Sequence, residues 1–166
     1  MYRIGHGYDI HRLQLGGKLV LAGVQVAEGI SPIAHSDGDV VIHALVDALL
    51  GAMGWGDIGQ WFPNSDARWK DAASVLFLEN VLEKLRAEEF WIGNADITIL
   101  AERPRLLPFR GAMVKFLCDR LNCPVNVKAG TNEGCDSVGR GEAIAAHAIV
   151  LVGKGGETGV AARSTM

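Results

Sequence analysis

The spacing of apolar and polar residues changes several times along the chain, and each change predicts a new element. Residues 1–12 and 18–26 have the composition of strands, with a turn between them at Gly16 and Gly17. Residues 27–35 are predicted to form a loop. The chain is therefore expected to begin with two short strands.

A helical spacing begins just after this loop. Apolar side chains recur every three or four positions from Val40 to Leu49, and the glycine-rich segment 51–56 predicts the end of this helix. Ser36 is predicted to be the N-cap, with Asp39 three residues later as the acidic partner of a capping box. These side chains are expected to satisfy the free N–H groups of the first turn.

The second half of the chain alternates between helices and strands. Spacing predicts helices over residues 72–88 and 108–121, and strands over 94–100, 125–129 and 143–152. The last of these strands is apolar on both faces, which indicates burial on both. We therefore expect an α+β fold in which one sheet carries helices on one face, and in which the uncovered face is buried by self-association.

Length and composition are those of one domain. The chain has 166 residues and a hydrophobic content of 49%, which suffices for a core. We find no repeat or linker that divides residues 1–153. The glycine-rich segment 154–166 is predicted to be a flexible tail.

Charge and targeting signals narrow the class of partners. The net charge of −3 argues against non-specific nucleic-acid binding, which depends on an excess of Lys and Arg. No apolar run approaches the roughly 18 residues of a membrane span, and no signal or transit peptide is recognisable. Cys118, Cys123 and Cys135 form no C-x-x-C pair, which favours a reducing compartment and argues against a cysteine zinc site. A bacterial cytoplasmic location is expected, with a mature plastid form as the alternative.

Histidines and carboxylates gather near the N-terminus. Asp9 and His11 project from the same face of a strand, because residues two apart point the same way. Together with His43 on the following helix, they offer one oxygen and two nitrogen ligands, which suits a catalytic zinc ion with an open fourth position. The alternative is a surface hydrogen-bonding pair and an unrelated helix histidine. Spacing alone leaves both interpretations open.

Neighbouring residues have two interpretations as well. Asp39 lies four residues before His43, so it either orients the imidazole or forms an ordinary surface pair with it. His35 and Ser36 precede a helix, where an anion such as phosphate is favoured, but Ser36 as a plain cap explains the pattern equally well. Acceptor-rich loops at residues 57–59 and 64–66 suit the hydroxyls of a polyol or are simple turns.

Further along the chain, residues 128–133 combine hydroxyl, amide and carboxylate groups after a short strand. Such a strand end suits a phosphate, and the Glu133 carboxylate suits a hard cation such as Mg²⁺. Arg140 adds a guanidinium that suits phosphate. The chain lacks a P-loop, and its glycines do not form a dinucleotide fingerprint.

These segments together resemble a known family. Over residues 2–153 the chain resembles the 2-C-methyl-D-erythritol 2,4-cyclodiphosphate synthase family of the non-mevalonate isoprenoid pathway. The segments that carry the resemblance are RIGHGYDIH at 3–11, AHSDGD at 34–39, ALVDALLG at 44–51, GDIG at 56–59, FP at 62–63 and GRGE at 139–142.

The resemblance implies a fold, an assembly and a reaction. It implies a ferredoxin-like α+β fold, a homotrimer with active sites between subunits, and an apolar central cavity. The implied enzyme is a phosphorus-oxygen lyase that acts on 4-diphosphocytidyl-2-C-methyl-D-erythritol 2-phosphate. The 2-phosphate attacks the β-phosphate, CMP leaves, and 2-C-methyl-D-erythritol 2,4-cyclodiphosphate forms.

The resemblance also implies roles for individual residues. Zinc ligands fall on Asp9, His11 and His43, and Glu133 falls where Mg²⁺ or Mn²⁺ is held with the substrate diphosphate. His35 and Thr131 are the implied phosphate-stabilising catalytic residues. The implied substrate-binding residues are Asp9, His11, His35, Ser36, Asp57, Ile58, Gly59, Phe62, Pro63, Asn64, Ser65, Asp66, Ala101, Glu102, Arg103, Pro104, Arg105, Leu106, Leu107, Thr131, Asn132, Glu133 and Arg140, with Arg140 and Glu142 near the central cavity, where some members hold an isoprenoid diphosphate.

Some positions depart from the commonest family pattern. Asn64 replaces a usual aspartate, Arg105 replaces a common lysine, and residues 135–137 replace a frequent Leu-Gly-Phe. Two rival functions are a metal-dependent phosphoesterase that uses water and a non-catalytic trimer that binds isoprenoid diphosphates. A closed structural zinc site needs a fourth protein ligand, for which His6 and His35 are the nearby candidates.

Overall fold

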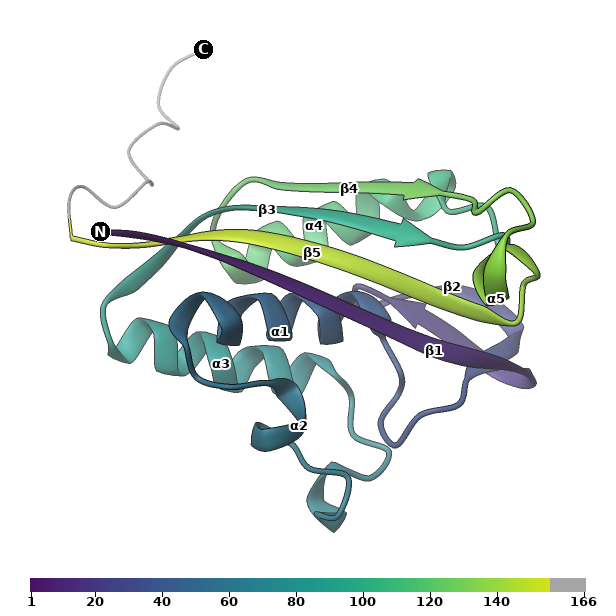
Figure 1. The fold of residues 1–166 in the computed structure, drawn as a ribbon, viewed down its shortest axis with the longest axis horizontal. Helices are drawn as coiled ribbons and strands as arrows, with labels where there is room; N and C mark the ends of the chain where they lie inside the picture. Colours follow the sequence, from purple (N-terminus) through teal and green to yellow (C-terminus); the bar gives the residue numbers. More distant parts are fainter. Residues whose placement is uncertain (156–166) are drawn as a thin grey trace.

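The fold combines one curled five-stranded sheet with helices, so the predicted α+β class is confirmed (Figure 1). The computed structural model describes residues 1–155. The strands follow the order β2-β1-β5-β3-β4 across the sheet, and β3 and β4 are the parallel pair. The elements are β1 (Tyr2–Leu21), β2 (Val24–Pro32), α1 (Val40–Met53), α2 (Ile58–Trp61), η1 (Ala67–Trp69), α3 (Val75–Ala87), β3 (Phe90–Leu100), η2 (Leu107–Phe109), α4 (Arg110–Leu121), β4 (Val125–Gly130), α5 (Asp136–Gly139) and β5 (Ala143–Lys154).

Most of the expected elements are present. The helices expected at 72–88 and 108–121 correspond to α3 and to η2 with α4, and the later strands are longer than expected by up to four residues. In the part of the sheet formed by β1, β5, β3 and β4, the chain order is β-α-β-α-β-β when the four-residue helix α5 between β4 and β5 is left aside. This order differs from the β-α-β-β-α-β of a strict ferredoxin-like fold.

The first strand is continuous, so the expected break at Gly16 and Gly17 is wrong. Both glycines have positive φ, and the register of the hairpin shifts beside them, which is the geometry of a bulge. The hairpin turns at Ala22 and Gly23, and β2 then continues to Pro32. The predicted loop at 27–35 is therefore wrong up to Pro32. A glycine pair marks a bulge as readily as a turn, and spacing alone does not distinguish them.

Asp39, and not Ser36, is the N-cap of α1. The Asp39 carboxylate accepts hydrogen bonds from the backbone N–H groups of Val41 and Ile42. It also accepts from Ala22 and Gly23 in the hairpin turn, at 2.9 and 2.8 Å. The expected capping box is therefore wrong. A single buried carboxylate satisfies the helix end and the hairpin turn together.

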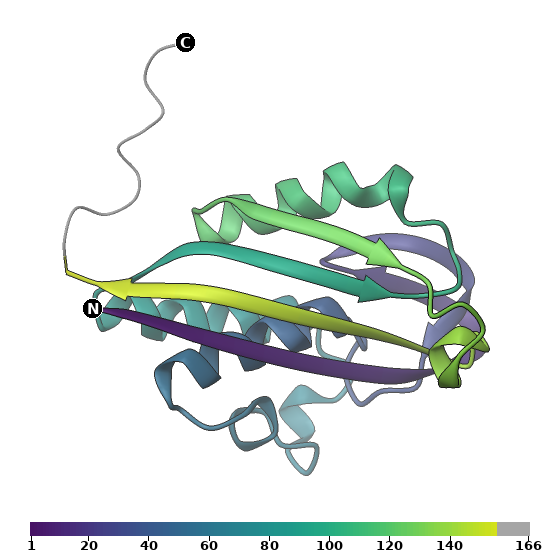
Figure 2. The ribbon, with the colours of Figure 1, turned by 45° about the horizontal axis from the view of Figure 1, so that its top comes forward.

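The three long helices α1, α3 and α4 lie on the same side of the sheet (Figures 1 and 2). The core between these layers includes Leu45, Leu49, Ile97, Ile99 and Leu117, all fully buried. The helices thus cover one face of the sheet, as the sequence predicts.

The opposite face of the sheet carries exposed apolar side chains. Along β1, Tyr2, Ile4, Tyr8 and Ile10 are 40–73% exposed, and Ile149 on β5 is 49% exposed.

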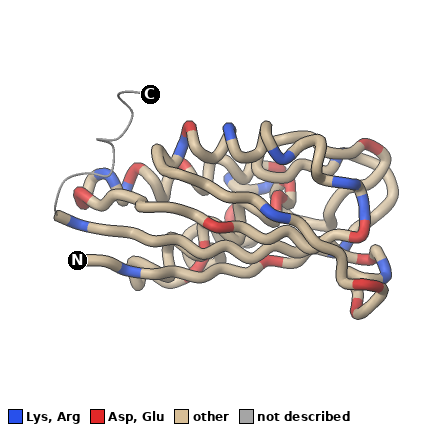
Figure 3. Tube along the Cα trace, turned by 90° about the horizontal axis from the view of Figure 1, so that it is seen from above, with Lys and Arg blue, Asp and Glu red and all other residues tan. Residues whose placement is uncertain are grey.

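Figure 3 shows Lys and Arg interspersed with Asp and Glu over the described trace. No helix within residues 1–155 is long and apolar enough to cross a membrane.

The expected domain spans residues 1–153, with a tail from residue 154. Lys154 still belongs to β5, and its backbone N–H donates to the Met1 carbonyl. Residues 156–166 lie outside the described residues.

Candidate metal centre and a second pocket

Asp9, His11 and His43 meet on the helix-covered side of β1. The His43 Nδ1 atom lies 3.0 Å from Asp9 Oδ2 and 3.2 Å from His11 Nε2. His11 Nε2 lies 3.1 Å from the same carboxylate oxygen. One oxygen and two nitrogens at this spacing match the donor set of a divalent transition metal. Within residues 1–155, this metal-ligand cluster has these three members.

The electrostatics of the cluster favour an ionised carboxylate. Burial by itself raises the pKa of Asp9, but hydrogen bonds with His11 and His43 outweigh it and hold the pKa well below its usual range. Asp9 is therefore deprotonated under ordinary conditions, as a metal ligand must be.

The cluster opens into a cavity of about 400 Å³. His35 Nε2 is buried there and has no hydrogen-bond partner among the described residues. A buried polar atom without a protein partner that faces a cavity is suited to bind a ligand or a water molecule there. The cavity is lined by Asp9, His11, Ile33, Ala34, His35, Ser36, His43, Ile58, Gly59, Phe62, Asn64, Trp69 and Phe77.

The second nitrogen of His43 faces two serines. His43 Nε2 lies 2.8 Å from Ser74 Oγ and 3.1 Å from Ser36 Oγ. The expected contact between Asp39 and His43 is wrong, because the Asp39 carboxylate is committed to four backbone N–H groups. Sequence reasoning missed Ser74, although a serine directly before an apolar helix is a recognisable N-cap signal.

Other expected substrate-binding residues lie beside the cavity or outside its lining. Asp57 is the N-cap of α2 and accepts from Gln60 N at 2.9 Å. Asp66 forms an ion pair with Arg68. Asp47, which the sequence analysis did not select, accepts from Ile58 N at 2.7 Å and so anchors the start of α2 beside the cavity. Pro63 and Ser65 do not line the cavity.

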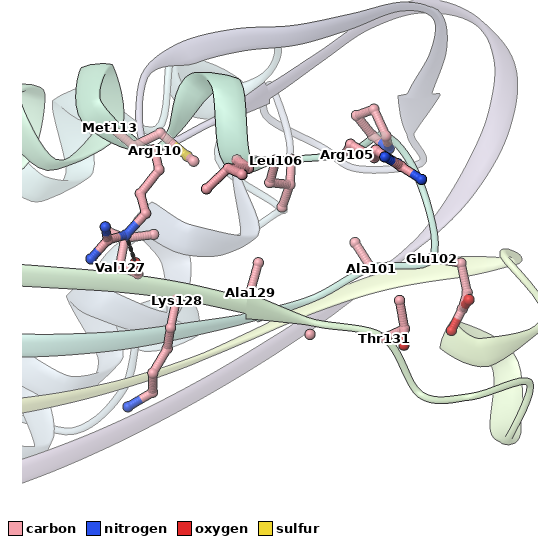
Figure 4. A pocket seen from close by; sticks show the side chains of 13 residues that line it. Ala101, Glu102, Arg105, Leu106, Arg110, Met113, Val127, Lys128, Ala129 and Thr131 are labelled. Atoms are coloured by element: carbon pink, nitrogen blue, oxygen red, sulfur yellow. Dashed lines mark hydrogen bonds between the residues drawn. The ribbon is translucent and has the colours of Figure 1, made fainter.

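A second pocket of about 410 Å³ lies between α4 and β4 (Figure 4). Arg110 donates to the Val127 carbonyl at 2.6 Å across this pocket. The lining residues are Ala101, Glu102, Pro104, Arg105, Leu106, Leu107, Arg110, Met113, Val127, Lys128, Ala129, Gly130 and Thr131. Six of the seven substrate-binding residues implied at positions 101–107 therefore line one pocket, together with Thr131, and Arg103 is the exception. This pocket shares no lining residue with the cavity at the metal-ligand cluster.

The loop after β4 holds the remaining expected residues. Thr131 Oγ1 donates to Glu133 Oε1 at 2.6 Å, and Asn132 N donates to Glu102 Oε1 at 2.9 Å. Glu133 is exposed and is not a member of the metal-ligand cluster. Farther along, Arg140 and Glu142 form an exposed ion pair at 3.0 Å.

Comparison with known proteins decides the family. The sequence profile of the YgbB family matches residues 2–153. The chain belongs to the YgbB family. It is 51% identical over 156 residues to 2-C-methyl-D-erythritol 2,4-cyclodiphosphate synthase from Xanthomonas axonopodis pv. citri (strain 306), covering 92% of this chain and 94% of that protein. The resemblance inferred from the sequence is thereby confirmed.

More distant members of the YgbB family show the same relationship. The chloroplastic 2-C-methyl-D-erythritol 2,4-cyclodiphosphate synthase of Oryza sativa subsp. japonica is 43% identical over 154 residues, which cover 91% of this chain and 69% of that protein. The solved structure of 2C-methyl-D-erythritol-2,4-cyclodiphosphate synthase in its CDP-bound form superposes with a TM-score of 0.84. That structure is 37% identical and covers 91% of this chain and 100% of its own.

Proposed function

We propose that this chain converts 4-diphosphocytidyl-2-C-methyl-D-erythritol 2-phosphate to 2-C-methyl-D-erythritol 2,4-cyclodiphosphate, as its relatives' names indicate for them. An oxygen of the 2-phosphate attacks the β-phosphorus, the bond from that phosphorus to the CMP oxygen breaks, and CMP leaves. No water is consumed, so the reaction is a phosphorus-oxygen lyase reaction. The single observation that carries the proposal is the cluster of Asp9, His11 and His43 at the cavity.

The donors of this cluster fit zinc. One carboxylate and two imidazoles, with no fourth His, Cys, Asp or Glu joining them within residues 1–155, leave a coordination position for substrate. When bound, the ion supplies positive charge that polarises a phosphate oxygen. His6 is not available as a closing ligand, because it lies three residues from Asp9 in β1 and so projects from the opposite face of the strand, where its Nε2 lies 3.1 Å from His147 Nδ1.

The chain's own residues act mainly by positioning. The nucleophile is already an anionic phosphate oxygen, so bringing two anions together and neutralising their charge governs the rate. The unpartnered His35 Nε2 is suited to hold a phosphate oxygen in the cavity. Gly59, Phe62 and Asn64 line the part of the cavity that we assign to the methylerythritol unit.

The second pocket is assigned to the cytidine end of a substrate bound mainly by a neighbouring subunit. Its lining contributes Arg105 and Thr131, which suit a diphosphate, and Glu133 follows two residues later as the proposed Mg²⁺ or Mn²⁺ ligand. The structure of a relative in its CDP-bound form supports a substrate that contains cytidine diphosphate. Because the two pockets share no residue, a substrate that needs both fits best between subunits.

A homotrimer provides such an arrangement and buries the open face of the sheet. The exposed Tyr8, Ile10 and Ile149 are the apolar contacts that we assign to this interface. Arg140 and Glu142 are assigned to the end of a central cavity that suits an isoprenoid diphosphate. We call the fold ferredoxin-like only because one sheet carries helices on one face. We also propose a cytoplasmic location.

The decisive experiment is ³¹P NMR of the purified protein with the diphosphocytidyl substrate and Mg²⁺, with and without a zinc chelator. Two coupled cyclic-diphosphate signals and CMP, both lost with chelator, are the expected result. Release of inorganic phosphate instead would establish a water-using phosphoesterase. An unchanged spectrum from folded, zinc-loaded protein would overturn the enzymatic proposal in favour of an isoprenoid-diphosphate-binding protein.

A further inference from the structure

Ser74 lies at the start of α3, but its side chain does not cap that helix. Ser74 is the N-cap residue of α3, yet its hydroxyl makes no hydrogen bond to the first turn. It is fully buried. A serine at this position ordinarily accepts from a backbone N–H of its own helix. Its hydroxyl therefore has another structural use.

The Ser74 hydroxyl connects His43 with Asp37. Its oxygen lies 2.8 Å from His43 Nε2, and its proton is donated to Asp37 Oδ1. An ionised carboxylate only accepts hydrogen bonds, so the Ser74 proton is committed to Asp37. The Ser74 oxygen can then act toward His43 only as an acceptor.

Asp37 is itself held in place by backbone groups. Its Oδ2 accepts from Ser74 N at 3.1 Å, and its Oδ1 accepts from Asp39 N at 3.2 Å. Asp39 is the N-cap of α1. The carboxylate of Asp37 therefore joins the first turns of α1 and α3 directly behind the metal-ligand cluster.

This chain of contacts determines which nitrogen of His43 faces a metal. A neutral imidazole has one N–H donor and one acceptor nitrogen. Because Ser74 presents an acceptor to Nε2, the proton of a metal-bound His43 is favoured on Nε2, which leaves the Nδ1 lone pair for the metal in place of the Nδ1–H···Asp9 hydrogen bond. Nδ1 is the atom that lies beside Asp9 and His11.

We propose that Ser74 and Asp37 are positioning residues that fix the ring orientation and tautomer of His43 for a divalent metal. The inference rests on the metal centre of the proposed function and assigns no contact between these two residues and substrate. Partners that hold the second nitrogen of a metal-bound histidine typically contribute 10–100-fold to metal affinity.

The test measures zinc affinity without substrate, by competition with a chromogenic chelator. Ser74→Ala and Asp37→Asn are expected to raise the zinc dissociation constant about 10–100-fold. Ser31→Ala on β2 is the matched control and is expected to leave the zinc dissociation constant unchanged. Ser36→Ala gives a smaller increase, because Ser36 Oγ lies at 3.1 Å and is not hydrogen-bonded to Asp37.

A second readout separates positioning from a general loss of folding. In zinc-loaded wild type, the His43 Nε2–H gives an exchange-protected ¹H–¹⁵N signal, which is retained in Ser31→Ala and lost in Ser74→Ala. Thermal unfolding of the zinc-free variants checks that they are folded. Wild-type zinc affinity and a protected signal in a folded Ser74→Ala variant would overturn the inference.

These outcomes are distinct from those of the proposed function. Tight zinc binding by wild type without cyclisation would defeat the proposed reaction and leave the positioning role intact. Cyclisation by wild type together with unchanged zinc affinity in Ser74→Ala and Asp37→Asn would overturn the positioning role and leave the proposed reaction intact.

Discussion

The methyl group that an alanine would add at Gly7 falls 1.9 Å from the carbonyl oxygen of Ala44, so β1 and α1 lie in backbone contact. Gly5 meets the Ala48 carbonyl in the same way, at 1.8 Å. This close approach is what brings Asp9, two residues beyond Gly7, within reach of His43 on α1. The spacing of the metal-ligand cluster thus depends on residues that ligate nothing.

Gly7→Ala is expected to destabilise the fold by at least about 1–3 kcal/mol, because a core that is already close-packed must move apart. The same movement separates Asp9 from His43 and weakens zinc binding. Urea unfolding and zinc titration measure the two effects. Gly111→Ala is the matched control: nothing lies near its Cβ position in α4, and it should stabilise by up to about 1 kcal/mol. Equal stability of the two variants would contradict the expected clash between a side chain at position 7 and the backbone of α1.

His43→Ala is expected to lose more than about 100-fold in zinc affinity, which exceeds the effect of removing a partner that only supports a ligand. Nearly all turnover should disappear with the metal. Zinc content by metal analysis and CMP release measure both effects. His35→Ala, in the same cavity, should keep its zinc and lose turnover. Normal activity in a zinc-free His43→Ala protein would refute the ligand assignment.

Glu133→Gln is expected to lower turnover about tenfold or more while zinc content stays near wild type, because each tenfold corresponds to about 1.36 kcal/mol of lost transition-state stabilisation. The loss should be accompanied by a higher Mg²⁺ requirement, measured by titrating the cation at fixed substrate. Glu28→Gln on β2 is the matched charge control. A parallel loss of zinc and turnover would argue against a separate cation at Glu133.

Asp39 is expected to make a pH-dependent contribution to the free energy of unfolding. Burial raises its pKa from 3.8 to about 6, although backbone N–H groups of Gly23, Ala22 and Ile42 act in the opposite direction. The folded state therefore holds a proton more tightly than the unfolded state, and this contribution falls as pH rises from about 4 to about 6. The stability advantage of wild type over Asp39→Asn should be larger at pH 4.5 than at pH 7.5. Urea unfolding at both values checks this, and an advantage that grows with pH would contradict it.

Ile149→Asp is expected to dissociate the proposed trimer, because it places a charge within an apolar patch on the open face of the sheet. Activity should fall with assembly, since each proposed active site uses two subunits. Sedimentation analysis gives the oligomeric state. Leu15→Asp, at a 91% exposed position in the β1–β2 hairpin, is the control and should remain assembled. An active monomeric Ile149→Asp protein would rule out a shared site.

Local patterns predicted the elements better than they predicted the connections between them. Helical spacing located α1, and its positions Val40, Leu45 and Leu49 are all buried. The glycine pair at Gly16 predicts a turn where the structure has a bulge, because positive φ is common to both structures. The sequence predicts Ser36 as the N-cap of α1, whereas the structure has Asp39 there, because sequence does not reveal that the hairpin turn at Gly23 approaches Asp39.

The sequence by itself determined the secondary-structure class, the family and the residues Asp9, His11 and His43, since strand alternation and family segments are local properties of the chain. Only the tertiary structure decided that these three side chains lie within hydrogen-bonding distance, because 34 residues separate Asp9 from His43 and no spacing rule spans that interval. It likewise brought Ser74 behind His43, 31 residues away. Such contacts depend on how closely β1, α1 and α3 pack, and packing is set by the shapes of all three elements together.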